Sequence, residues 1–157
     1  MSDDILSHIP SLRAYSRVLC RNRSDAEDLV QETLLRAIEY AHQYKPGTNL
    51  RAWMFKIMRN LFFTQCRKSA RERTGSTDCA SERVSVGPGQ EWHMMALEVR
   101  GVLDKMPAHY RETIVLVGAL GVSYIDAAEL LDCDIGTIKS RMNRARSILR
   151  MELELEF

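Results

Sequence analysis

Apolar residues recur every three or four positions through most of the sequence, which is the period of an amphipathic α-helix. The first stretch with this period runs from Ile5 to Leu19. The second follows Ser24, which forms a capping box with Glu27 three residues later. The positions predicted to face inward on this second helix are Leu29, Leu34, Ala37, Ile38 and Ala41.

A third helix is predicted after residues 45–49, because the proline and glycine in that stretch end the second one. Thr48 or Asn49 can cap its N-terminus. Trp53 and Phe55 cannot share one face of this helix, so we expect at least one of the two rings to be partly exposed. The positions predicted to face inward are Trp53, Ile57 and Leu61.

The helical period is lost at Arg73 and returns near Trp92. Nine of the 17 residues from 74 to 90 are Gly, Pro, Ser or Thr, a composition typical of a flexible linker. We therefore expect two domains, residues 1–73 and 91–157, joined by a flexible linker at 74–90. Each is close to the lower size limit for an independent core and no strand pattern is sustained, so the predicted fold class is all-α, with two small helical domains.

The second domain ends in a predicted helix-turn-helix. It is preceded by a helix that ends at Pro107 and by another over residues 109–120. Ser123 can cap a short apolar helix, residues 132–134 form a tight turn, and Asp134 can cap the helix that follows. The inward positions predicted for the second domain are Met95, Val99, Val102, Met106, Ile138, Met142, Ala145 and Leu149.

The composition excludes several classes of protein. The apolar share of 45% is ordinary for a folded domain. No apolar run approaches the roughly 18–20 residues of a membrane span, and the acidic start Met1–Asp4 is unlike a signal peptide. We therefore expect a cytoplasmic protein without a membrane segment. The four cysteines and four histidines are scattered, so no disulfide framework, metal site or other cofactor is expected.

The net charge of +1 conceals three charged blocks. Residues 51–73 contain seven basic side chains and one acidic one, residues 136–150 contain five basic and no acidic ones, and residues 24–44 contain five acidic and one basic. Two separate basic blocks predict two contacts with a polyanion, although a solvated helix face is the alternative for each block alone. Aromatic side chains alternate with the cations of residues 51–73, a mixture suited to duplex opening or single-strand capture. The outward face of the last helix combines cations with hydroxyl groups, which suits a DNA major groove.

Three stretches carry a resemblance to a known family. Residues 25–33 (DAEDLVQET) and 49–60 (NLRAWMFKIMRN) resemble region 2 of bacterial extracytoplasmic-function (group IV) sigma factors. Residues 136–146 (GTIKSRMNRAR) resemble the recognition helix of region 4 in the same family. Residues 44–49 (YKPGTN) and 116–119 (LVGA) further resemble its alphaproteobacterial general-stress-response group.

The resemblance implies a non-enzymatic subunit that gives core RNA polymerase its promoter specificity and melts promoter DNA, here of stress-response genes. It assigns core polymerase and the −10 element to the first domain, and the −35 element to the second. The residues implied to bind core polymerase are Asp25, Glu27, Asp28, Gln31 and Glu32. Those implied to bind and open the −10 element are Thr48, Asn49, Arg51, Trp53, Lys56, Arg59 and Asn60. Those implied to bind the −35 element are Thr137, Lys139, Ser140, Arg141, Arg144 and Arg146.

The resemblance also implies an anti-sigma factor as a partner, because the family is commonly held inactive by one. The apolar and acidic tail, residues 151–157, is one candidate docking strip for it. An alternative function is that of a sigma-like decoy, which binds an anti-sigma factor without binding DNA, but the two intact basic blocks favour promoter binding. An enzyme such as a nuclease would need convergent carboxylates or a nucleophile with its base, and the pattern shows no such cluster.

Overall fold

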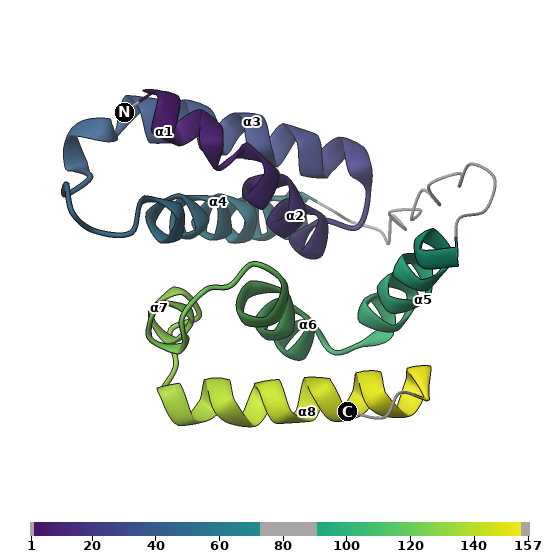
Figure 1. Cartoon of the computed structure of the whole chain (residues 1–157). Helices are drawn as coiled ribbons and strands as arrows, with labels where there is room; N and C mark the ends of the chain where they lie inside the picture. The colour runs from purple at the N-terminus through teal and green to yellow at the C-terminus, as the bar shows by residue number, and fades with distance from the viewer. Residues whose placement is uncertain (1, 73–90, 155–157) are drawn as a thin grey trace. The chain divides into compact units, whose positions relative to one another are not determined.

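The computed structural model describes residues 2–72 and 91–154, which form two compact helical units (Figure 1). We call them the N-terminal unit and the C-terminal unit. The prediction of an all-α fold with two small helical domains is confirmed. The predicted linker at residues 74–90 and the last three residues of the tail lie outside the described residues.

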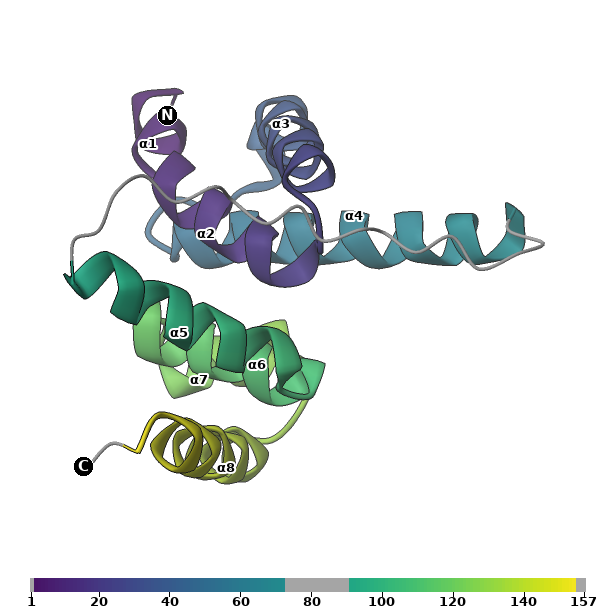
Figure 2. The same cartoon turned by 90° about the vertical axis from the view of Figure 1, so that its right-hand side faces the viewer.

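In the N-terminal unit, the three longer α-helices pack against one another around a single core. Its elements are α1 (Ser2–Ser7), α2 (Ile9–Leu19), α3 (Arg23–Glu39), the 3-10 turn η1 (Ala41–Gln43) and α4 (Leu50–Glu72). Helix α3 packs against α2 and α4, α2 packs against α4, and α1 contacts α2 and α3. The last turns of α4 extend past α2 and α3, and residues 63–71 are exposed (Figure 2).

The core of this unit is aromatic and methionine-rich. Its fully buried large side chains are Leu12, Tyr15, Leu29, Met54, Phe55 and Met58. The Tyr15 ring packs edge-on against the Phe55 ring with 5.0 Å between centroids, an arrangement that adds to the stabilisation from buried area. The buried hydroxyl of Thr33 donates to the carbonyl oxygen of Leu29 in the preceding turn, so it leaves no unsatisfied polar atom in the core.

Asparagine side chains cap two of these helices. The Oδ1 of Asn22 accepts from the Asp25 backbone N–H at 2.7 Å, and its Nδ2 donates to the Asp25 carboxylate at 2.8 Å. The prediction that Ser24 caps α3 was wrong, because Asn22, two residues earlier, is the N-cap and Ser24 lies in the first turn of the helix. At α4 the Oδ1 of Asn49 accepts from the Ala52 N–H at 3.1 Å, as predicted.

Two predicted inward faces differ from those observed. On α4 the stripe is displaced by one residue, because Met54 and Met58 are buried while the predicted positions Trp53, Ile57 and Leu61 are only half-buried. On α3, Ala37 is buried but Ile38 is 62% exposed, since it lies about 100° further around the helix. The expectation for the two rings is confirmed, because Phe55 is buried and Trp53 is partly exposed.

The C-terminal unit is built around its last and longest helix. Its elements are α5 (Glu91–Lys105), α6 (Ala108–Ile114), the π-helical turn η2 (Val115–Ala119), α7 (Tyr124–Leu130) and α8 (Ile135–Leu153). Helix α8 packs against α5, α6 and α7. The core includes Met106, Leu116, Ala127, Ile138, Met142 and Ala145. Met95 was predicted to face inward, but it lies near the N-terminus of α5 and is 60% exposed.

The joint between α5 and α6 is held by Arg111. Its guanidinium donates to the carbonyl oxygens of Leu103 and Asp104 in the last turn of α5 at 3.4 and 3.3 Å. The Leu103 oxygen also accepts from the Met106 backbone N–H. The helix predicted over residues 109–120 is regular only to Ile114 and continues as the π-helical turn. Gly121 then takes a positive φ of 68°, which glycine adopts without strain.

Helices α7 and α8 form the predicted helix-turn-helix. The Ser123 hydroxyl oxygen accepts from the Asp126 N–H at 3.1 Å and caps α7. The helix ends in a Schellman turn with Asp132 at a φ of +52°, where the Asp132 N–H donates to Glu129 and the Cys133 N–H to Ala128. Asp134 occupies the N-cap position of α8 as predicted, with the extended backbone of that position, but its carboxylate accepts no capping hydrogen bond.

Candidate DNA and protein interfaces

The solvent side of α8 has a shallow depression lined by cations and hydroxyl groups. Its volume is about 640 Å³, and α8 contributes Thr137, Ser140, Arg141 and Arg144 to its lining. These four side chains share one face of the helix, because they are three or four residues apart. They are four of the six residues predicted to bind the −35 element. Lys139 and Arg146, the other two, are exposed outside this depression.

The two arginines of the depression differ in their exposure to solvent. Arg141 is half-buried, and its Nη1 lies 4.0 Å from the Cys133 sulfur in the turn before α8. Because sulfur is a weak acceptor, this contact places the guanidinium beside the turn without holding it strongly. Arg144 is exposed one turn further along. The face therefore combines a half-buried guanidinium beside the turn with an exposed one.

On the N-terminal unit, the loop before α4 is compact. Gly47 takes a φ of +89°, a conformation that side chains disfavour. The Thr48 hydroxyl donates to the Lys45 carbonyl oxygen at 2.7 Å, and the Tyr44 hydroxyl donates to the Thr48 carbonyl oxygen. The Tyr44 ring also packs on the Trp53 ring, with 5.3 Å between centroids. These contacts hold residues 44–49 against the first turns of α4.

The predicted −10 residues of α4 lie in two groups. Trp53, Lys56 and Asn60 have the spacing of one helix face, which is turned away from the buried stripe. The guanidinium carbons of Arg51 and Arg59 instead lie 5.7 and 4.6 Å from the centroids of the Phe55 and Phe63 rings. Such cation–π contacts restrain the position of each arginine side chain. Thr48 and Asn49 are exposed at the start of the helix.

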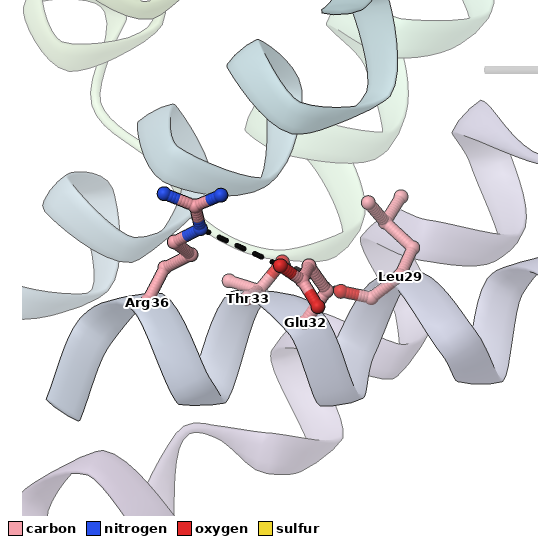
Figure 3. Close-up of polar contacts among 4 residues, drawn as sticks. All are labelled: Leu29, Glu32, Thr33 and Arg36. Carbon is pink, nitrogen blue, oxygen red and sulfur yellow. Dashed lines mark hydrogen bonds and ion pairs between the residues drawn. The ribbon is translucent and has the colours of Figure 1, made fainter. Parts of the chain in front are cut away.

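The acidic side chains of α3 lie around its solvent face. Asp25, Asp28 and Gln31 are exposed, and Glu27 and Glu32 are half-buried. The Glu32 Oε1 lies 3.4 Å from the Arg36 Nε, one turn along the same helix (Figure 3). The neighbouring Thr33 hydroxyl donates instead to the Leu29 carbonyl oxygen. The hydrogen bond with Glu32 raises the pKa of Arg36. Because both side chains are 41% exposed, this pair contributes little to folding.

Two apolar side chains stand beside these acids and were not among the predicted contacts. Leu35 and Ile38 are each 62% exposed. With Asp28 and Gln31 they follow helical spacing along the outer face of α3, opposite the buried Ala37. A face that combines exposed leucine and isoleucine with carboxylates is typical of a protein-binding surface. We call Asp28, Gln31, Leu35 and Ile38 the outer stripe of α3.

Sequence patterns also missed Tyr44, His109 and Tyr110. Tyr44 was noted only as part of residues 44–49, and its role follows from its packing on Trp53. His109 and Tyr110 line the depression beside α8 from the neighbouring helix α6. No periodic signal marks them, because only the packing of α6 on α8 brings them to this surface.

Within residues 2–72 and 91–154, no three or more His, Cys, Asp or Glu side chains are arranged to hold a metal ion. The helices in the same ranges include none long and apolar enough to cross a membrane.

Known families and structures are similar to both units. The model of Sigma-70 region 2 matches residues 5–72, and that of Sigma-70 region 4 matches residues 96–149. The chain is 49% identical over 149 residues to the ECF RNA polymerase sigma factor EcfG of Rhodopseudomonas palustris, covering 95% of this chain and 82% of the relative.

Two solved structures are also similar. The sigma factor RpoE of Bartonella quintana, solved in complex with the anti-sigma factor NepR, is 40% identical, with a TM-score of 0.86 over 99% of this chain and 97% of the other. CnrH, solved with the cytosolic domain of CnrY, is 25% identical, with a TM-score of 0.69 over 97% of this chain and 86% of the other. From the two family matches and the identity to EcfG, the chain belongs to the extracytoplasmic-function (ECF) RNA polymerase sigma factors.

Proposed function

We propose that this chain directs core RNA polymerase to a set of promoters by binding their −35 element through α8 and opening their −10 element through α4. The observation that carries the proposal is the solvent face of α8. A helix-turn-helix places its second helix in the major groove, and here that helix presents Thr137, Ser140, Arg141 and Arg144 on one face. Guanidinium groups pair with guanine edges or phosphates, and hydroxyl groups add register.

The proposed −10 contact rests on the compact loop and the outer face of α4. Trp53 presents a partly exposed ring, and Lys56 and Asn60 lie on the same helix face. A ring can stack on an unpaired base while a lysine neutralises the adjacent phosphate. The loop from Tyr44 to Asn49 is already folded against Trp53, so ordering it on DNA would cost little entropy.

Core polymerase is proposed to bind the outer stripe of α3 together with Asp25, Glu27 and Glu32. The carboxylates suit a basic partner and steer its approach, and Leu35 and Ile38 offer apolar area for it to bury. An anti-sigma factor is proposed as a second partner, because the sigma factors of the two similar structures were solved with NepR and CnrY. The family is not one of enzymes, and we propose that this member acts in the cytoplasm, where core polymerase and DNA are found.

A stress-response regulon is proposed on the resemblance of residues 44–49 and 116–119. The test of the general proposal is capture of genomic DNA by core polymerase with and without the full chain, followed by heparin challenge and sequencing. The proposal predicts heparin-resistant fragments that share two sequence blocks at a fixed spacing. If the chain binds an anti-sigma factor but adds no sequence-specific fragments, it is a decoy and the proposal is wrong.

A further inference from the structure

The depression beside α8 is formed by two helices, and only one of them belongs to the helix-turn-helix. The α8 side of its lining includes Arg141, Arg144 and the hydroxyl groups of Thr137 and Ser140. The other side is made by His109 and Tyr110 of α6. Neither of these two residues has a role in the function proposed above. Because they line the same depression as Arg141 and Arg144, a DNA strand that occupied this depression would contact residues of both helices.

The two rings form a platform with a polar edge. The centroids of the His109 and Tyr110 rings lie 4.1 Å apart, with the ring planes inclined by 52°. His109 is exposed and Tyr110 is half-buried, so the tyrosine supports the histidine from the protein side. An imidazole donates through a ring N–H, and its flat face can pack against a sugar. The hydroxyl of Thr113 donates to the His109 carbonyl oxygen at 2.7 Å, a backbone contact that any residue at position 109 retains.

We propose that His109, supported by Tyr110, binds the sugar–phosphate backbone of one promoter strand at the edge of the major groove that α8 enters. This inference rests on the proposed −35 contact of α8 and adds a second element to it. The imidazole N–H donates to a phosphate oxygen, and the deoxyribose lies over the two rings. Because backbone contacts fix register without reading bases, the histidine positions α8 rather than selecting the sequence.

The distribution of charge in the depression places the phosphate at one end. Asp134 also lines the depression, and its carboxylate repels a phosphate. It precedes Arg141 by seven residues and Arg144 by ten, which at about 1.5 Å per residue separates their Cα atoms by about 10 and 15 Å along α8. The cationic end is therefore the end that accepts the anion. An acidic segment of a protein partner is the competing occupant, and the experiment separates the two.

The experiment uses holoenzyme, assembled from core polymerase and the full chain, on a promoter obtained by the capture described above. The dissociation constant is measured for the wild type, His109→Ala and His109→Glu, and for Ala96→Glu on the exposed surface of α5 as a matched charge control. We expect the dissociation constant to increase about threefold for His109→Ala, which loses one hydrogen bond, and about tenfold for His109→Glu, which adds repulsion of the phosphate. It should not change for Ala96→Glu. Position 109 is exposed, so thermal unfolding of the four proteins should coincide.

A scan with neutral methylphosphonates then tests the backbone assignment. Each phosphate across the −35 block is replaced in turn on both strands. At one or two adjacent phosphates at the edge of the block, the substitution should weaken binding of the wild type but not of His109→Ala. Substitutions at phosphates contacted by Arg141 or Arg144 should weaken both proteins. Base substitutions within the block should weaken both proteins equally.

Two controls decide what a negative result means. If Arg144→Ala lowers promoter affinity but the methylphosphonate profiles of the wild type and His109→Ala coincide, the α8 contact stands and the inference for His109 is wrong. If Arg144→Ala also has no effect, the proposed −35 contact fails and the inference fails with it. If His109→Glu weakens only the binding of an anti-sigma factor, the depression binds protein rather than DNA and the inference is overturned.

Discussion

Replacing Leu35 and Ile38 together by alanine should weaken the binding of core RNA polymerase without lowering the stability of the chain. Both side chains lie on the outer stripe of α3 and are 62% exposed, so they contribute little to the core of their own unit. Alanine is the strongest helix former and preserves α3. The charges of the stripe are unchanged, so any loss of affinity reports on the two apolar side chains alone.

The expected size of the effect follows from their exposure. A buried methylene contributes about 0.8 kcal/mol, and each substitution removes about three such groups. Scaled by the 62% of each side chain that a partner can still bury, this is about 1.5 kcal/mol per residue. The double variant should then lose about 3 kcal/mol if polymerase covers both side chains completely. This corresponds to a decrease in affinity on the order of a hundredfold.

The assay is equilibrium binding of labelled full-length chain to core polymerase, followed by fluorescence anisotropy. Leu6→Ala is the matched control, because Leu6 is 57% exposed on α1 of the same unit and lies outside the stripe. The control should bind as the wild type does, and all three proteins should unfold at the same temperature. An affinity of the double variant equal to that of Leu6→Ala would refute the assignment of this stripe to polymerase.

Three further predictions concern charge and capping. Reversing the charge of both Asp28 and Glu32 to lysine should weaken core polymerase in co-purification while leaving thermal unfolding almost unchanged, since the Glu32–Arg36 pair is exposed; undiminished co-purification would contradict it. Arg141→Ala should decrease promoter affinity of the holoenzyme and make its salt slope shallower by about 0.9 if the side chain neutralises one phosphate; identical slopes would exclude that contact. Asn49→Ala removes the cap of α4 and should cost about 1 kcal/mol, which calorimetry would detect as a melting transition several degrees lower, whereas Asn49→Asp should keep the wild-type transition.

Local patterns predicted the helices better than they predicted which side of each helix is buried. On α4, Trp53 and Met54 both begin series at steps of four, and periodicity alone does not choose between them. The choice is made by packing, because the Phe55 ring meets Tyr15 of α2 and brings Met54 and Met58 into the core. The same limit explains Ile38. It fits an apolar helical series, but it lies about 100° around the helix from the buried Ala37 and is exposed.

In the candidate sites, too, residues that act from one helix were predictable, whereas residues brought together by packing were not. Residues that act from one helix, such as Ser140 and Arg144, could be predicted because their spacing places them on one face. His109 could not, because it reaches the same depression only through the packing of α6 on α8. Asn22 and Ser24 are both good N-caps by type, and the reciprocal hydrogen bonds of Asn22 with Asp25 decide between them. Sequence analysis thus predicts contacts within one element and misses those that depend on how elements pack.

Transcription from a promoter library is the most direct test of the proposed function. Core polymerase would be supplied with templates randomised over two blocks upstream of the start site, with and without the full chain, and the transcripts sequenced. The account predicts transcripts that depend on the chain, share two sequence blocks at a fixed spacing, and disappear when Arg141 and Arg144 are both replaced by alanine. Transcription no greater than that of core polymerase alone, or transcripts without any shared sequence, would contradict it.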